Sequence, residues 1–141
     1  ADKLARHRME PGDTVYGRRG DIGRRAYIGP RQRGWLCGTG SLRIRPDSSQ
    51  ILPRYLFETL GSPTTAANIA SQAKGSTMLN LSAGALQRVP VLCPPLALQR
   101  EFVDEVEPIA ALIEVLSEQN QKLQQARDLL LPRLMRGDLV V

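Results

Sequence analysis

The sequence predicts an α+β fold: a small mixed β/α domain over residues 1–95, a long coiled-coil helix over 96–136, and a short tail over 137–141. Two observations predict this division. The first part alternates short apolar segments with glycine- and proline-rich turns, which is typical of short strands and helices. From Leu96 onward, apolar residues instead recur at intervals of four and three, as in a helix that pairs with another helix.

A hairpin with arginines at its tip is predicted near the start of the domain. Short strands at 14–16 and 26–28 flank a loop at 17–23 that contains three glycines. Glycine adopts a positive φ without steric cost and lets the backbone approach another backbone closely, which suits contact with a phosphate group. The spacing GxxGxxG differs from the dinucleotide-binding fingerprint, so it predicts no cofactor.

Strict alternation predicts a third strand at 41–45. Leu42 and Ile44 would face the core, and Arg43 and Arg45 would form a basic face on the other side. The elements expected next are helices at 53–60 and 64–73, a polar loop at 74–80, a short helix capped by Ser82 and ending at Gln87, and an edge-type strand at 89–92 ended by Pro94 and Pro95.

The long helix carries a heptad seam. Its helix-pairing residues occupy alternating d and a positions and are Phe102, Val106, Ile109, Ile113, Leu116, Asn120, Leu123, Leu130 and Leu134, with Arg127 at one further a position. Asn120 at an a position fixes register at some cost in stability, which favours pairing with one defined helix. Pro108 and Pro132 each remove an amide donor and are expected to kink the helix or begin a new segment. A helix packed on its own domain is the alternative, but a helix of about 60 Å is too long for a small domain to bury completely.

Positive charge is concentrated in the first part of the chain. Residues 1–54 hold 12 Lys/Arg against 5 Asp/Glu, a net charge of +7, whereas residues 55–141 hold 7 against 9, a net charge of −2. Most of the basic residues are arginines, whose planar guanidinium suits phosphate oxygens and guanine edges. A polyanion is therefore the expected partner, with an ordinary solvated surface as the alternative. A membrane surface is not expected, because these arginines lie among glycines and short strands rather than along an amphipathic helix.

The sequence shows no set of residues that is typical of a metal site or of a catalytic site. Cys37 and Cys93 lack a paired spacing, are expected to be small buried side chains, and form no zinc set with the single histidine, His7. The few carboxylates of the basic part are scattered through predicted turns. There is no apolar stretch of 18 residues and no signal peptide, so a cytoplasmic protein without membrane contact is expected.

DNA is the expected polyanion, contacted through the hairpin, the basic strand face and the polar loop. The candidate DNA-binding residues are Arg18, Arg19, Arg24, Arg25, Arg43, Arg45, Lys74, Ser76, Thr77 and Asn80. Asn80 suits pairing with adenine, but a purely structural role in turning or capping the backbone is equally compatible with its position.

The order of these motifs resembles the specificity (S) subunit of type I restriction-modification enzymes. The resemblance covers most of the chain and rests on four segments. Gly12-Asp13 together with 19–23 is similar to the family's "GD…R.G.IG" hairpin, and 40–44 is similar to the strand that follows it. The segment 75–99 is similar to "GST..NLS…L…IPVP.PPL..Q". The segment 129–139 is similar to "LLP.LMSGEL", with Arg136 where Ser is usual.

This resemblance implies the C-terminal part of a target-recognition domain, over residues 1–95, followed by one conserved helix. It implies sequence-specific recognition of double-stranded DNA, without catalysis, in a complex with DNA methyltransferase (M) subunits and possibly a restriction (R) subunit on a bipartite site. Because an apolar seam rarely stays exposed to water, the isolated chain is expected to form a homodimer through its helix. The resemblance favours antiparallel pairing, since the family's two helices run antiparallel, whereas the sequence alone also allows a parallel pair. The alternatives are a coiled-coil adaptor or a DNA-binding module of another modification or defence system.

Overall fold

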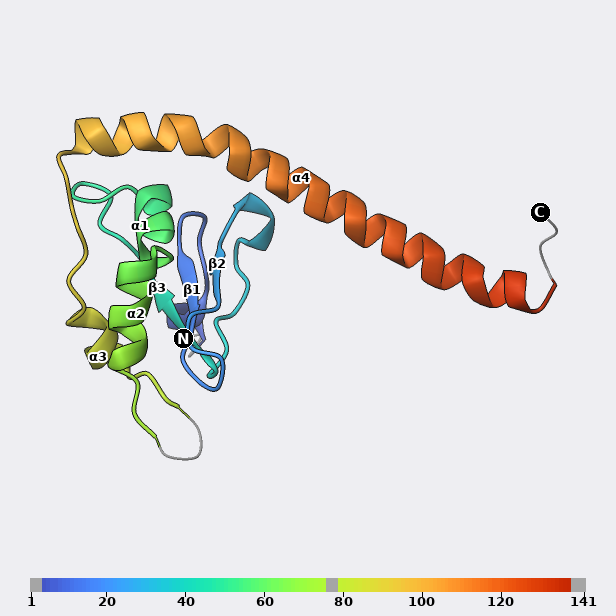
Figure 1. Cartoon of the computed structure of the whole chain (residues 1–141), viewed down its shortest axis with the longest axis horizontal. Helices are drawn as coiled ribbons and strands as arrows, with labels where there is room; N and C mark the ends of the chain where they lie inside the picture. Colours follow the sequence, from blue (N-terminus) through green and yellow to red (C-terminus); the bar gives the residue numbers. More distant parts are fainter. Residues whose placement is uncertain (1–3, 76–78, 138–141) are drawn as a thin grey trace. The chain divides into compact units, whose positions relative to one another are not determined.

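The computed structural model describes residues 4–75 and 79–137 and has the α+β fold that the sequence predicts. The chain divides into two compact units, residues 1–103 and 104–141. The first unit contains a small sheet, with α1 and α2 along one side of it in Figure 1. In the described part of the second unit, the chain is helical from its start to Met135. The boundary between the units falls inside the long helix α4, which begins at Leu96 as predicted.

Three antiparallel strands form the sheet in the order β2-β1-β3. These are β1 (Thr14–Gly17), β2 (Arg25–Tyr27) and β3 (Ser41–Ile44). Each lies within one residue of its predicted position. Tyr16 in β1 is opposite Arg25 in β2 and Leu42 in β3, so the central strand places its largest side chain directly over the core.

Proline and serine explain where the helices of the first unit begin. The helices are α1 (Pro53–Leu60), α2 (Pro63–Ser71) and α3 (Ala83–Gln87), with single turns of 3-10 helix at Ala5–His7 and Pro30–Gln32. Pro53 and Pro63 occupy first-turn positions, where the missing amide donor is not needed. Ser62 and Ser82 accept hydrogen bonds from the backbone amides of Thr65 and Ala85 respectively, so Ser82 is the N-cap that the sequence predicts.

One predicted strand does not form. The described segment at 89–92 has no strand pairing. Pro90 lacks an amide donor, so this stretch cannot complete a ladder of backbone hydrogen bonds. Val89 and Val91 instead pack against the core as irregular chain, and the carbonyl of Leu92 accepts a hydrogen bond from the Tyr55 hydroxyl at 3.2 Å.

The core of the first unit lies between the sheet and helices α1 to α3. Its buried members are Tyr16, Leu56, Leu60, Ile69, Leu81 and Ala85. Leu42 and Ile44 of β3 pack against this cluster, which confirms the inward face predicted for that strand. The prediction that both thiols are buried is wrong for Cys93, which is exposed at the end of an irregular segment, and Cys37 is only half-buried.

Gln99 holds the first turns of α4 within the first unit. Its side chain is fully buried and accepts a hydrogen bond from the Leu52 amide at 2.7 Å. It donates to the carbonyls of Pro94 at 2.7 Å and Gln50 at 3.1 Å. Because every strong bonding site of this buried amide has a partner, it can be buried without a large desolvation cost.

Helix α4 (Leu96–Met135) runs through both prolines without interruption. Of the two outcomes expected at Pro108 and Pro132, the start of a new segment does not occur, and a kink stays a prediction. Each proline removes only one amide donor, and the hydrogen bonds on both sides of it keep the helix continuous. The seam residues beyond Val103 are exposed, apart from half-buried Val106, and none of the described helices is both long and apolar enough to cross a membrane.

Candidate nucleic-acid interface

The predicted arginine hairpin and the predicted polar loop lie against each other. The amide of Gly20 donates to the Leu79 carbonyl at 3.2 Å, and the amide of Leu81 donates to the Arg18 carbonyl at 2.8 Å. Lys74 and Asn80 exchange two backbone hydrogen bonds that close the base of the loop. Two segments about 60 residues apart in sequence thus form one surface.

The side chains of this loop are only partly described. Lys74 and Asn80 are both exposed, whereas Ser76 and Thr77 lie outside the described residues. The backbone of Asn80 has a structural role, because its amide and carbonyl bond Lys74. Its amide side chain remains at the surface, so the base-reading role and the structural role assigned to Asn80 are compatible.

Two glycines of the hairpin loop have backbone angles that favour glycine strongly. Gly20 has φ of +68° and Gly23 has φ of +115°. A side chain at either position would be strained, so glycine at these two sites fixes the turn that presents Arg19 and Arg24.

A basic groove of about 720 Å³ opens beside the hairpin. Its charged lining consists of Arg6, Arg18, Arg19 and Arg43, together with His7, and no carboxylate of the described residues lines it. A concave surface with one sign of charge concentrates the field and attracts a polyanion. We refer to this feature below as the basic groove.

Arg18 has unused bonding capacity in the basic groove. The residue is half-buried, and its Nε atom is buried without a hydrogen-bond partner among the described residues. A buried N–H without a partner costs free energy, so a movement of this side chain that brings Nε to an anionic oxygen in the groove would be favourable. Arg43 is held in place by a 2.6 Å bond from Nη1 to the Arg8 carbonyl.

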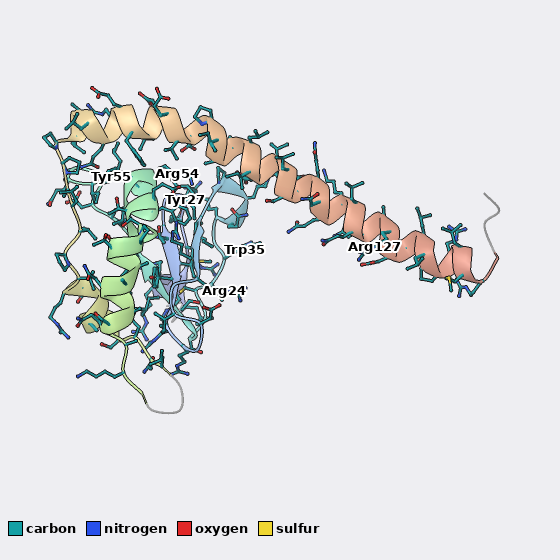
Figure 2. The ribbon with its side chains drawn as sticks, viewed as in Figure 1. Arg24, Tyr27, Trp35, Arg54, Tyr55 and Arg127 are labelled. Atoms are coloured by element: carbon teal, nitrogen blue, oxygen red, sulfur yellow. The ribbon has the colours of Figure 1, made fainter. Side chains whose placement is uncertain are left out.

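Arg19 and Arg24 are the most accessible arginines of the hairpin. Arg24 exposes 82% of its side chain and forms an ion pair with exposed Asp21 at 3.3 Å. An ion pair in such an exposed position contributes little stability and is readily exchanged for a phosphate. Figure 2 shows Arg24 pointing away from the ribbon.

Arg25 is engaged inside the first unit. Its Nε donates to the Phe57 carbonyl at 3.1 Å, and its guanidinium lies 4.8 Å from the Phe57 ring centroid. Arg54 lies over the Tyr27 ring at 3.9 Å on the same cluster, as labelled in Figure 2. These contacts fasten β2 to α1, so Arg25 stabilises the fold at this point.

Arg45 forms a two-pronged ion pair with buried Asp13. Nε and Nη2 of Arg45 each lie 2.7 Å from a carboxylate oxygen of Asp13. Burial by itself would raise the pKa of Asp13, but the hydrogen bonds from Arg45 and the Glu10 amide, and the charges of Arg45 and Arg43, outweigh it and lower that pKa. The Asp13 pair thus anchors Arg45 at the end of β3.

Two members of the basic groove were missed by the sequence reasoning. Arg6 and His7 precede the first strand and have no motif that marks them. They reach the groove because residues 7–9 pair with 34–37, including an isolated bridge between Arg8 and Leu36. Arg6 Nε donates to His7 Nε2 at 3.1 Å, so this nitrogen of the imidazole acts as an acceptor.

The described residues contain no group of three or more His, Cys, Asp or Glu side chains arranged to hold a metal ion. Beside its arginines and imidazole, the basic groove is lined by the hydroxyl side chains of Thr39 and Ser41 and by the Cys37 thiol.

Comparison with known proteins gives concordant results. Residues 8–125 match the family described as the type I restriction modification DNA specificity domain. The type I restriction enzyme HindI specificity subunit of Haemophilus influenzae is 30% identical over 97 residues, which are 68% of this chain and 21% of that protein. The chain thus spans about a fifth of the length of this curated relative.

Two solved structures share the fold. The HsdS subunit from Thermoanaerobacter tengcongensis is 22% identical with a TM-score of 0.61, over 87% of this chain and 32% of that one. A second, described as the structural basis of complex assembly and conformational transition of the type I R-M system, is 21% identical with a TM-score of 0.58, over 94% and 35%. Since the family match extends over most of the chain, this protein belongs to the type I restriction modification DNA specificity domains.

Proposed function

We propose that this chain binds double-stranded DNA and supplies sequence specificity to a type I restriction-modification complex. The observation that carries the proposal is the basic groove, which lies directly beside the junction of the hairpin and the 74–80 loop. A carboxylate-free groove lined by four arginines suits the phosphate backbone, which supplies most of the affinity of DNA-binding proteins.

Phosphate contact and base recognition are assigned to different parts of this surface. Arg18, Arg19 and Arg43 would contact phosphates from the groove, and exposed Arg24 would extend that contact. The polar side chains of loop 74–80 would reach base edges, where short donors and acceptors carry sequence information. We do not assign DNA contacts to Arg25 and Arg45, because their guanidinium groups are hydrogen-bonded to partners within the fold.

The partners we propose are methyltransferase (M) subunits and, in the complete complex, a restriction (R) subunit. The likeness to the HindI specificity subunit supports this assignment. We propose that the chain itself catalyses no reaction, needs no cofactor and acts in the cytoplasm, so that the chemistry belongs to its partners. In isolation, helix α4 would pair with a second copy through its exposed seam.

Fluorescence anisotropy of a labelled duplex, titrated with the full chain at several salt concentrations, tests the DNA-binding proposal. Arg18→Ala and Arg19→Ala should each weaken binding for all sequences and reduce the slope of log K against log salt by roughly one unit. Arg100→Ala is the matched control, because Arg100 is an exposed arginine of the same unit that lies outside the basic groove. Equal losses in all three variants would contradict the assignment of the groove.

A coiled-coil adaptor is the second candidate, favoured by the exposed apolar residues of α4. It shares the helix with the first proposal but predicts no affinity of the groove for DNA. Absence of binding at low salt, where electrostatic attraction is strongest, would therefore support the adaptor and refute the DNA reader.

A further inference from the structure

Trp35, which is the single tryptophan of the chain, exposes 61% of its surface. Large aromatic side chains are costly to leave in water and are enriched where proteins bind partners. The indole is not part of the core cluster described above. This degree of exposure at the end of an ordered turn points to a contact with a partner.

The backbone presents the indole on a rigid support. The Trp35 amide donates to the Gln32 carbonyl at 3.0 Å, and the Trp35 carbonyl accepts from the Met9 amide at 2.8 Å. The preceding Gly34 bonds the Met9 carbonyl at 2.8 Å and has φ of +81°, a conformation that favours glycine. Bonds on both sides of Trp35 therefore fix where its side chain leaves the chain.

The surroundings of the indole are basic. Arg33 directly precedes the Gly34 turn, and Arg8 Nη1 donates to the Gly34 carbonyl at 3.4 Å. The carboxylate of Glu10 is already paired with Arg33 Nε at 2.8 Å. In Figure 2, Trp35 and Arg24 both extend outward on the side of the unit away from α1 and α2. An exposed aromatic ring among arginines is complementary to a polyanion with flat apolar bases, which describes nucleic acid. In a duplex, such a ring reaches a base face where a base step is partly unstacked.

We propose that Trp35 is a DNA-contacting side chain, whose indole packs against bases of the bound duplex while neighbouring arginines lie on phosphates. Apolar side chains inserted at a base step and aromatic rings stacked on bases are established ways in which proteins grip nucleic acid. The inference rests on the proposed function and extends the DNA-binding surface beyond the basic groove to the turn at 33–36.

The single tryptophan allows a direct test with the unmodified full chain. Titration with a short unlabelled duplex should quench Trp35 emission, because a base packed on the indole provides a path for loss of the excited state. The quenching should saturate at the same DNA concentration as anisotropy of the labelled duplex, and it should reverse on addition of salt.

Substitution provides the second arm of the test. Trp35→Ala should weaken DNA binding roughly 5- to 100-fold, the range that loss of one stacking contact produces. Trp35→Phe keeps an aromatic ring and should restore most of the affinity. Leu92→Ala, which shortens a side chain of the same unit that is 76% exposed, is the matched control and should bind as the wild type does.

The outcomes separate this inference from the proposed function. If the duplex binds by anisotropy while Trp35 emission stays constant and Trp35→Ala binds normally, the inference is overturned, DNA binding stands, and the indole belongs to a protein contact. If anisotropy shows no binding at low salt, the proposed function fails and this inference fails with it.

Discussion

A single buried amide links the long helix to the rest of the first unit. Gln99 bonds Gln50 and Leu52 in one loop and Pro94 just before the helix, so two separate stretches of chain depend on one side chain. The sequence marks this residue only through its resemblance motif, whereas its physical role depends on a loop almost 50 residues earlier. The Phe102 ring of α4 also packs edge-to-face on Tyr55 of α1 with the ring centroids 5.5 Å apart, so a buried amide and an aromatic contact together fix the first turns of the helix.

Gln99→Leu preserves the volume of this side chain but removes its hydrogen bonds. The Leu52 amide and the Pro94 carbonyl would lose this partner, so the free energy of unfolding should fall by about 2–4 kcal/mol. Urea denaturation followed by Trp35 fluorescence measures this loss. Gln87→Leu, at an exposed glutamine, is the control and should change the stability by less than about 0.5 kcal/mol. Equal stability of the two variants would contradict the role assigned to Gln99.

The ion pair of Asp13 and Arg45 predicts a pH dependence of stability. Because the pKa of Asp13 is lowered in the folded chain, its contribution is fully present above its ordinary value of 3.8. That contribution is lost as the pH falls through 3.8 toward the lower pKa of the folded state.

Asp13→Asn should reduce the stability at neutral pH by about 1–3 kcal/mol and flatten its decline under acid, because the substituted side chain cannot be protonated there. Urea denaturation at pH values from neutral to acid measures both effects. Asp21→Asn, at the exposed partner of Arg24, should behave almost as the wild type. An acid transition as steep in Asp13→Asn as in the wild type would show that other groups control it.

Among the secondary-structure elements, helix α4 exposes many large apolar side chains, more than is expected for a helix that stays unpaired in water. Leu123 on the seam exposes 67% of its surface and Leu129, outside the seam at a c position, exposes 72%. The two leucines thus differ in seam position but hardly in exposure. Substitutions of these two leucines therefore distinguish specific helix pairing from non-specific hydrophobic association of an apolar helix.

Leu123→Asp should convert a dimer into a monomer, since a carboxylate at a d position would be buried without a partner in the paired state. Sedimentation equilibrium of the full chain at micromolar concentration gives the mass directly. Leu129→Asp should remain dimeric, because a c position faces solvent in a two-helix pair. A wild-type chain that is monomeric throughout this range would refute the homodimer.

Pro108 offers a second test of the helix, because it interrupts the hydrogen-bond ladder without ending the helix. Pro108→Ala restores one amide donor and a better helix former, so it should stabilise α4 by up to about 3 kcal/mol and raise its melting temperature. Thermal melting followed by circular dichroism measures the change. Pro63→Ala, in the first turn of α2, should give little gain, because proline is tolerated there.

For the molecule as a whole, the proposed DNA contact and the proposed helix pairing fall in different units of the chain. The basic groove and Trp35 lie in residues 1–103, whereas most of the seam lies in 104–141. Substitutions in the helix seam should therefore leave the affinity of one basic groove for DNA unchanged, and substitutions in the groove should leave helix pairing unchanged. Sites without shared partners act independently.

Pairing should nevertheless strengthen binding to long DNA through avidity. On a duplex of roughly 40 base pairs, the wild-type chain should bind at least about tenfold more tightly than Leu123→Asp, because a dimer can engage two segments of the duplex. On a duplex of roughly 10 base pairs, which is one helical turn, the two proteins should bind equally. Anisotropy measures the affinity of both proteins for both duplexes. If the ratio of wild-type to Leu123→Asp affinity is the same on the long and the short duplex, the result would argue against a bivalent dimer.

The elements that depend on local chemistry could be predicted from the amino-acid sequence alone. Glycine spacing predicted the hairpin loop, the helix range 53–60 matched α1, and Ser82 identified the cap of α3. The 4-and-3 spacing placed the start of the long helix at Leu96. These features are encoded within a few residues of one another, so their patterns remain visible without tertiary contacts.

Which of these residues come into contact depends on the packing of the folded chain and could not be predicted from the sequence. The chain fold brought Arg6 and His7 to Arg18, and it joined the hairpin to loop 74–80 through backbone bonds. It also committed Arg25 and Arg45 to internal partners, although both belong to the same basic sequence pattern as Arg24. A count of charges along the chain cannot distinguish arginines that bond inside the fold from arginines that stay at the surface. The internal partners lie about 30 residues away and are selected by packing of the core against the sheet.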